Sequence, residues 1–253
     1  MFSSTHGKKS VAVARYTCLL VVSLLALVML PAAVPRYPVV PFSTAKMIIE
    51  VNATDGDAGI QISVDAPGWK RLTVFDPGGE EIFEVQAAGS VEQQGVTELF
   101  FESEEPSFDE VPLAEFLARF PEGEYTFTGR TTDGQRLRGK ARFTHNIPAG
   151  PEIAFPAEGA VLPANMPVVI DWQPATGPFP GANSAVTVTG YQVIVDRVNS
   201  NPLRVFSVML PASVTQVTVS PQFIEAKAEY KFEVLAIEVG GNQTITERTF
   251  KTK

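Results

Sequence analysis

The sequence predicts an all-β protein made of two tandem β-sandwiches, the first of which carries one short inserted helix. Segments in which apolar residues alternate with other residues recur through the chain, a pattern typical of strands with one buried face. Twenty prolines and nineteen glycines suit the many turns of such a fold. The 253 residues are enough for two domains of ordinary size.

The first 33 residues are expected to form a secretory signal peptide. Three basic residues precede an uncharged apolar run, Cys18–Leu30, and small residues ending at Ala33 follow it. The run is short for a bilayer span, which needs roughly 20 residues. The alternative is an uncleaved anchor formed by residues 18–34. We therefore expect an exported protein, periplasmic or extracellular, and the leader suits a bacterial precursor.

Cleavage would change the chemistry that the chain can offer. It removes Cys18 and His6, so His145 is the only histidine left and no disulfide can form. A zinc site or a histidine-activated nucleophile would lack its usual side chains. Loss of three basic residues takes the formal net charge from −8 to −11, which opposes nucleic acid and anionic membrane as general partners. A membrane partner is expected only if the leader is kept.

A proline-rich spacer is expected over residues 34–46, followed by an immunoglobulin-like sandwich over residues 47–146. The turns Asp76–Gly79 and Thr132–Gly134 use residues that tolerate tight hairpins. The predicted strands are Met47–Ala53, Gly59–Asp65, Arg71–Asp76, Glu81–Gln86, Glu98–Glu102, Gly123–Arg130 and Gln135–Thr144.

The helix is predicted over Val111–Phe120, where apolar residues at 113, 116, 117 and 120 fall on one helical face. Pro112 suits the first turn of this helix. We expect it to cover one end of the sandwich. The following segment, Glu122–Gly129, has a Gly-x-Tyr start and resembles the penultimate strand of an immunoglobulin-like sandwich.

A short linker, residues 147–151, leads to the second domain, residues 152–253. Its predicted strands are Val168–Trp172, Gly190–Val195, Val205–Leu210, Val214–Val219, Tyr230–Ala236 and Thr244–Phe250. The order of Trp172, a Gly-Tyr-x-Val segment at Tyr191, and a Tyr-x-Phe-x-Val-x-Ala segment at Tyr230 resembles a fibronectin type III domain. The resemblance implies a module that binds, spaces or presents, without catalysis.

The same resemblance implies a role for Tyr230. Ile224 lies six residues before it, as the apolar anchor does before the corner tyrosine of that family, whose phenol bonds to the backbone near the start of the strand. The sequence departs from the family pattern in a long Pro/Gly-rich stretch, Gln173–Ala185.

The sharpest local polar cluster is Asn52, Asp55 and Asp57. Oxygen ligands at this spacing suit calcium, the one cofactor that we consider. The cluster lacks the twelve-residue EF-hand pattern, and the same residues would also serve a β-turn between two strands. Both interpretations stay open, with the turn favoured.

Two surfaces are candidates for partner binding, the partner being a protein or a glycan. Arg136, Arg138 and Lys140, with Arg142, share one face of a strand. They form either a charged solvent face that protects a sheet edge or a docking strip for an anionic partner. Leu235 and Ile237 are expected to point away from the core, where they would meet another chain or the first domain.

Two weaker signals remain. Asn52 and Asn242 each begin a glycosylation sequon, a pattern that also occurs by chance. An acidic run at residues 102–110 could supply the paired carboxylates of a glycosidase, although a solvated loop is favoured. The leading hypothesis is an exported, non-catalytic binding, adhesion or scaffold protein of the cell envelope or extracellular space. The alternatives are a secreted carbohydrate-active enzyme or its accessory protein, and a membrane-anchored subunit.

Overall fold

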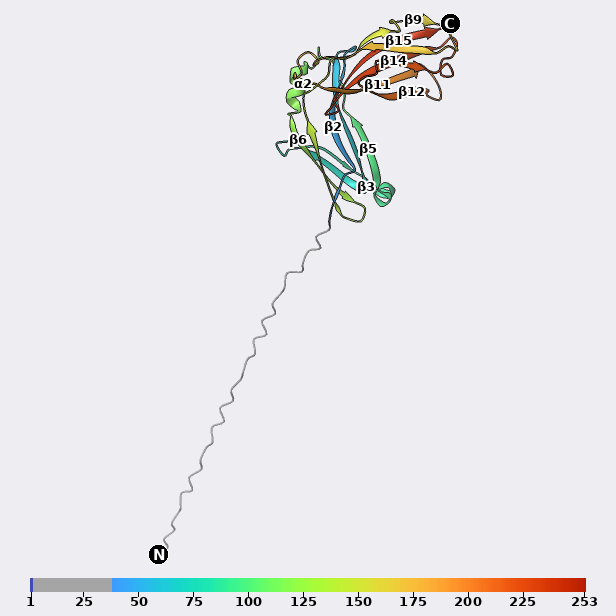
Figure 1. Cartoon of the computed structure of the whole chain (residues 1–253). Coiled ribbons are helices and arrows are strands. Elements are labelled where there is room, and N and C mark those ends of the chain that lie inside the picture. The colour runs from blue at the N-terminus through green and yellow to red at the C-terminus, as the bar shows by residue number, and fades with distance from the viewer. Residues whose placement is uncertain (2–37) are drawn as a thin grey trace. The chain divides into compact units, whose positions relative to one another are not determined.

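The computed structural model describes Met1 and residues 38–253 (Figure 1). The expected signal peptide, residues 1–33, and the alternative anchor, residues 18–34, lie outside the described residues. Within the described part of the chain, no helix has the length and apolar character needed to cross a bilayer. The protein is mostly β-strand with few helices, as the sequence predicts, and its two hydrophobic cores define two lobes.

The first lobe contains seven strands and two short helices. They are β1 (Val39–Pro41), β2 (Thr44–Asn52), β3 (Asp57–Phe75), β4 (Glu81–Gln86), α1 (Gly89–Gln94), β5 (Val96–Glu102), α2 (Leu113–Arg119), β6 (Gly123–Thr131) and β7 (Arg136–Phe143). The two strands predicted at Gly59–Asp65 and Arg71–Asp76 are one long strand, β3. Its first half pairs with β2 and β5, and its second half pairs with β4 and β6. The long strand therefore belongs to both layers of the lobe.

The expected spacer is partly structured. Strand β1 pairs in parallel with β7, and β2 begins at Thr44, so much of residues 34–46 belongs to the sandwich. Gly139 permits this packing, because a Cβ there would lie 2.9 Å from the Cβ of Ala45 and 3.0 Å from Phe42. Phe42 in turn packs edge-on against the core ring of Phe127. The sequence analysis missed these contacts because the proline-rich composition of residues 34–46 indicated an extended spacer.

Helix α2 confirms the short helix expected in the first lobe. It buries Phe116 and Leu117 against the core, which is the face that the apolar spacing predicts. Helix α1 was not expected, and none of its residues is buried. The sequence signal for a helix is the apolar face, and α1 has none.

The second lobe packs two sheets around Trp172, Tyr191 and Tyr230. Its strands are β8 (Glu152–Phe155), β9 (Ala160–Leu162), β10 (Val168–Gln173), β11 (Val188–Arg197), β12 (Val205–Pro211), β13 (Gln216–Val219), β14 (Glu229–Glu238) and β15 (Gln243–Thr252). Strands β13, β10 and β8 form one sheet, and β15, β14, β11 and β12 form the facing one. The Trp172 and Tyr191 rings lie 5.3 Å apart in the core between them.

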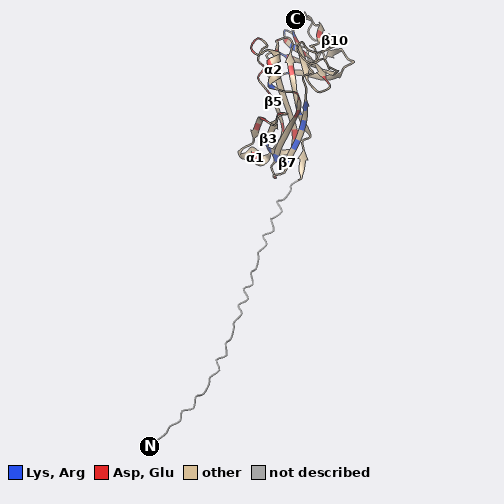
Figure 2. Ribbon diagram, turned by 90° about the vertical axis from the view of Figure 1, so that its left-hand side faces the viewer, with Lys and Arg blue, Asp and Glu red and all other residues tan. Residues whose placement is uncertain are grey.

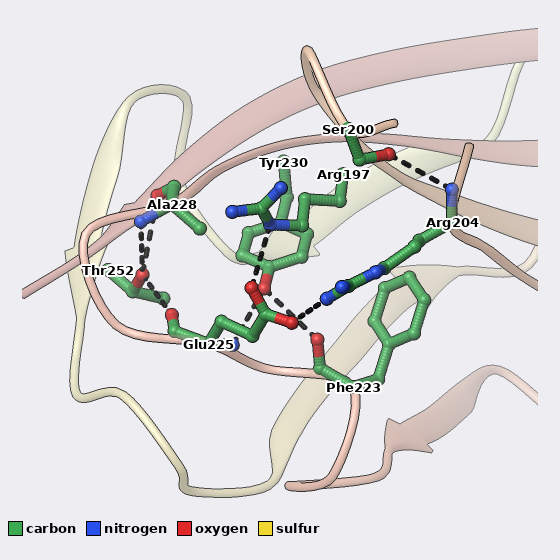
Figure 3. Close-up of polar contacts among 8 residues, drawn as sticks. All are labelled: Arg197, Ser200, Arg204, Phe223, Glu225, Ala228, Tyr230 and Thr252. Atoms are coloured by element: carbon green, nitrogen blue, oxygen red, sulfur yellow. Dashed lines mark hydrogen bonds and ion pairs between the residues drawn. The ribbon is translucent and has the colours of Figure 1, made fainter. Parts of the chain in front are cut away.

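Tyr230 makes the corner contacts that the resemblance implies (Figure 3). Its hydroxyl donates to the carbonyl of Phe223 at 3.0 Å and accepts from the backbone N–H of Glu225 at 2.7 Å. The Glu225 carboxylate forms ion pairs with Arg197 and Arg204. In the first lobe the Tyr125 hydroxyl donates to the Pro121 carbonyl at 3.0 Å, so both lobes carry a tyrosine at the corner of the corresponding strand.

The two lobes share one sheet. Residues Glu50–Asn52 of β2 pair in parallel with Gln243–Ile245 of β15, which joins both lobes into a 12-stranded sheet. In Figure 1 the blue strand β2 of the first lobe reaches the red strands of the second. The continuous sheet fixes the two lobes to each other through backbone hydrogen bonds.

Asn242 reinforces this joint. Its side-chain oxygen accepts from the backbone N–H of Ile49 at 2.9 Å. Its side-chain nitrogen donates to the carbonyls of Thr144 and Asn146 at 2.9 and 3.0 Å. The residue is 2% exposed, so it cannot accept a glycan in the folded protein, and the sequon at this position is a chance match.

The stretch Gln173–Ala185, where the sequence departs from the fibronectin type III pattern, lies against the first lobe. The Phe179 ring packs 5.9 Å from that of Phe108, and its backbone N–H donates to the Ile147 carbonyl at 2.8 Å. The Asn183 side chain donates to Glu122 at 2.9 Å. We call residues 173–185 the strap.

The expected linker, residues 147–151, is part of this joint. Ile147 is fully buried in the first core, and the Pro148 carbonyl accepts from the Thr244 hydroxyl at 2.6 Å. The pairing of β15 with β2 and the contacts of the strap also join the lobes, and the sequence analysis missed both because these contacts come from distant sequence.

Asn242→Ala should lower the free energy of unfolding by about 3 kcal/mol. The variant leaves one N–H and two carbonyls without their partner at a buried site, and each such group costs roughly 1 kcal/mol or more. Urea unfolding would measure the loss. Asn183→Ala is the matched control, because Asn183 is exposed and its side chain makes one bond to a carboxylate. Equal effects of the two substitutions would contradict the role given to Asn242.

Candidate binding surfaces

Strand β7 presents its basic residues on one face, as the sequence predicts. Arg136, Arg138, Lys140 and Arg142 are exposed, whereas the alternate residues Leu137, Ala141 and Phe143 belong to the first core. The alternation follows from the two-residue period of a strand. The structure does not test whether these residues bind a partner, and that role stays a prediction.

Strand pairing brings two further arginines to this face that the sequence analysis did not single out. Arg71 of β3 lies opposite Arg130 of β6, and Arg130 lies opposite Arg136 of β7. The next row places Thr73, Thr128 and Arg138 side by side. We call the outer surface of β3, β6 and β7 with these residues the basic face. Figure 2 shows the blue residues along β7.

The basic face is hollowed. A depression of about 570 Å³ is lined by four arginines together with Val39, Glu81, the threonines of the middle strand and other residues of the sheet. The four arginines are Arg71, Arg130, Arg136 and Arg138. A smaller depression of about 340 Å³ continues along Arg138 and Lys140 beside β1. Neighbouring arginines in a hollow can reach the same bound group, so the surface fits an anionic ligand or partner.

The proposed calcium residues form a hairpin turn between β2 and β3. The side-chain oxygen of Asn52 accepts from the backbone N–H groups of Thr54 and Asp55 at 2.9 and 3.2 Å, and its nitrogen donates to Asp55 at 3.1 Å. Asn52 and Asp57 are register partners, so the structure does bring the three residues together. The turn accounts for Asn52 without a metal. Calcium binding by Asn52, Asp55 and Asp57 remains a prediction.

A different acidic cluster lies at the joint between the lobes. Carboxylate oxygens of Glu50, Glu102 and Glu105 can all come within 4.8 Å of one another. Two glutamines connect the cluster to the sheet. Gln61 donates to Glu102 at 2.8 Å, and Gln243 donates to Glu50 and, at 3.4 Å, to the Gln61 oxygen. The network crosses β5, β3, β2 and β15 and therefore links both lobes.

Burial and neighbouring charge raise the pKa of two of these carboxyl groups, those of Glu50 and Glu105. Burial, followed by the nearby carboxylates of Glu102, Glu50 and Asp57, raises the pKa of Glu105 to about 7. Burial also raises the pKa of Glu50, although its hydrogen bond from Gln243 opposes the shift. The Glu105 side chain packs directly against the backbone of Gly59. A side chain at position 59 would prevent this contact, because its Cβ would lie 2.8 Å from the Glu105 side chain.

The expected apolar strip on β14 is only partly exposed. Leu235 and Ile237 do point away from the core of the second lobe, since they alternate with Val234 and Ala236. Leu235 is nevertheless only 3% exposed, between Gln192 and Ile245 on the neighbouring strands. Leu235 thus points outward as expected but is not exposed to solvent, and a partner-binding role for Leu235 and Ile237 stays a prediction. Ile237 is half-buried.

His145 has a structural role. Its ring nitrogen Nε2 lies 2.8 Å from the Phe120 carbonyl, and its backbone N–H donates to the Glu122 carboxylate at 2.8 Å. This hydrogen bond, together with that from Asn183, lowers the pKa of Glu122. The histidine thus helps to place the loop on which the strap rests, as expected for a residue beside the domain joint.

Sequence reasoning missed Arg71, Arg130, Glu50 and Gln243 as parts of these surfaces. Strand register brings each of the four next to the other residues of its surface, and a single sequence does not reveal that register. A weak signal existed for Glu50, a charged residue within the apolar strand Met47–Ala53. Such residues are rarely buried without a partner.

The acidic cluster predicts that stability falls as pH rises. Between about pH 4.5 and 7 the folded state holds a proton on Glu105 that the unfolded state releases, so the free energy of unfolding decreases through this range. Glu105 is an exposed side chain, and water screens the effect to about 1 kcal/mol. Glu105→Gln should remove this decrease and make the protein more stable than wild type at pH 8.

Urea unfolding at pH 5, 6, 7 and 8 measures this difference. Glu104→Gln is the control, because Glu104 is the exposed neighbour in the same segment and does not belong to the cluster. If Glu105→Gln and wild type show the same pH dependence, Glu105 does not titrate near neutrality.

Comparison with known proteins gives similarity to solved structures alone. No family model and no curated protein matches the chain. A segment of two fibronectin type III domains from chicken tenascin is similar at 13% identity and a TM-score of 0.28, covering 83% of this chain and 98% of the segment. The FN1–FN3 domains of chicken CNTN1 are similar at 11% identity and a TM-score of 0.31, covering 85% of this chain and 65% of theirs.

The third fibronectin III domain of human KIAA0343 protein is similar at 14% identity and a TM-score of 0.30, covering 42% of this chain and 84% of that domain. At these identities the likeness concerns the fold alone. The structural neighbours are fibronectin type III domains, and the likeness of this chain to them is one of fold.

Proposed function

We propose that this protein is an exported, non-catalytic binding or scaffold component that holds one contact surface in a fixed orientation. The observation that carries the proposal is the shared sheet between the lobes. Backbone pairing of β2 with β15, the side chain of Asn242 and the strap all join the same two bodies. A joint of this kind serves presentation and spacing, because it prevents the hinge motion that is the default for tandem domains.

The basic face is the contact surface in this proposal. Arg136, Arg138 and Lys140 project from β7 and are joined by Arg71 and Arg130 through strand register. The chain as a whole carries a net charge of −8. A local concentration of positive charge on an acidic protein selects an anionic partner by charge complementarity, with little attraction elsewhere on the surface. Ile237 remains a secondary candidate for contact.

The rival function, sugar hydrolysis by paired carboxylates, has one supporting observation in the cluster of Glu50, Glu102 and Glu105. Two of these groups are already engaged in structure, since Gln243 donates to Glu50 and Gln61 donates to Glu102. A catalytic pair needs its oxygens free for the sugar and for water. This use of the carboxylates favours a structural network over a catalytic site.

The fixed joint can be measured by pulsed electron paramagnetic resonance. The form that begins at residue 34 contains no cysteine, so Thr132→Cys in the first lobe and Gln222→Cys in the second would carry the only two spin labels. Both positions are exposed. We expect a single narrow distance distribution. Adding Asn242→Ala and Phe179→Ala should broaden it, because these substitutions remove contacts of the joint.

A label pair within the second lobe, at Gln216 and Gln222, is the control and should stay narrow in both backgrounds. A broad distribution between the lobes of the otherwise unsubstituted protein would refute the fixed joint.

Export makes a separate prediction. The protein isolated from its native cells should start near residue 34, and N-terminal sequencing or mass spectrometry would show this. An intact N-terminus in the membrane fraction would instead support the alternative, a subunit anchored by residues 18–34.

A further inference from the structure

We propose that the basic face docks on a lipid bilayer that contains anionic phospholipid. The proposal rests on the proposed function in taking the basic face as the contact surface, and it names the partner of that surface. Three features of the molecule support a bilayer as the partner: the arrangement of the arginines, their incomplete neutralisation within the fold, and the place where the N-terminal segment joins the sheet.

The arrangement of the arginines lowers the stability of the sheet. Arg71, Arg130 and Arg136 are direct neighbours across three strands, with Arg138 in the next row. Like charges placed opposite each other destabilise a sheet. Protection of a sheet edge does not require this arrangement, because β1 already covers β7 at residues 136–138. The arrangement is therefore better explained by an anionic ligand outside the fold.

The charges of this face are only partly neutralised from within. Arg71 forms an ion pair with Glu84, Lys140 forms one with Glu124, and the Arg130 side chain donates to the Gly134 carbonyl. Within residues 38–253, Arg136 and Arg138 have no ion-pair partner.

In the second lobe, three basic residues are neutralised by nearby carboxylates. Arg197 and Arg204 both pair with Glu225, and Lys231 pairs with Glu233 and Glu247. Figure 3 shows the Glu225 carboxylate between its two arginines. The contrast with Arg136 and Arg138 concerns these three residues, because Lys227, Arg248 and Lys253 of the second lobe have no ion-pair partner among residues 38–253 either.

The N-terminal segment joins the fold beside the basic face. Val39 of β1 is the register partner of Arg136 and lines the same hollow, so the chain reaches the sheet at the row of arginines. Eight residues, 31–38, separate the end of the apolar run Cys18–Leu30 from Val39. An extended segment of that length spans about 30 Å at most. In the alternative form that keeps residues 18–34 as an anchor, insertion of the apolar run into a bilayer would therefore keep Arg136 near the bilayer surface.

The surroundings of the arginines also suit a bilayer. Val39 is 57% exposed among the basic residues, and threonine hydroxyls lie in the neighbouring rows. A wide hollow with several arginines can contact several lipid phosphates at once, and each basic residue adds to the attraction. A folded acidic protein would be expected to need a larger apolar centre on this surface.

Vesicle co-sedimentation tests the proposal. Every described strand lies within residues 39–252, so the form beginning at residue 34 retains the whole described fold. It should bind vesicles of phosphatidylcholine with about 30% phosphatidylglycerol at low salt, and it should bind pure phosphatidylcholine at least tenfold more weakly. The combined substitution Arg130→Gln, Arg136→Gln and Arg138→Gln should weaken binding to the anionic vesicles about 100-fold.

Two variants keep this test specific. Lys227→Gln, Lys251→Gln and Lys253→Gln remove the same charge from exposed positions of the second lobe and should change binding less than threefold. Arg136→Lys with Arg138→Lys retains the charge and should retain binding, provided that thermal melting shows each variant folded. If the two triple glutamine variants lose vesicle binding equally, the attraction depends only on net charge and not on the basic face, and the proposal is overturned.

Soluble polyanions separate this proposal from the proposed function. If wild type ignores anionic vesicles but binds a sulfated polysaccharide or polyglutamate through Arg136 and Arg138, the bilayer proposal fails and the basic face still has an anionic partner. If wild type binds neither vesicles nor polyanions, both the bilayer proposal and the role of the basic face fail.

Discussion

The structure depends on the pairing of three consecutive residues with the opposite lobe. Asn242 bonds to the backbone of the first lobe, Gln243 reaches Glu50 and Gln61, and Thr244 donates to the Pro148 carbonyl. Buried polar groups are costly unless they are satisfied, and here each lobe supplies the partners that the other lacks. Neither lobe can separate without exposing unpaired groups, so the joint behaves as part of the fold.

The joint also separates the charges of the molecule. Three carboxyl groups lie close together beside it: Glu50 accepts from Gln243, Glu102 accepts from Gln61, and Glu105 lies next to both. The arginines lie on β3, β6 and β7 in the other layer of the first lobe. Because β3 belongs to both layers, one strand contributes Gln61 to the acidic network and Arg71 to the basic face. The fold thus displays two chemically distinct surfaces at a fixed separation.

Much of this could be predicted from the sequence, and the reasons for the remainder are physical. The two-residue alternation located β7 and oriented Arg136 and Arg138 correctly, because only one face of that strand is apolar. The resemblance at Tyr230 correctly implied its corner hydrogen bonds. The pairing of β2 with β15 and the row formed by Arg71, Arg130 and Arg136 depend on register between distant segments, which no local pattern encodes. For the same reason the burial of Leu235 between neighbouring strands was not predicted.

The pairing of β2 with β15 has a consequence for how the chain acquires its structure. Glu50 and Gln243 are separated by 193 positions along the chain, so this ladder has very high contact order and forms late in folding. Until the last strand is available, β2 retains an open hydrogen-bonding edge. Loss of even the final eleven residues would leave that edge unpaired and prone to intermolecular association. The first lobe therefore completes its hydrogen bonding only when the last strand of the chain pairs with β2.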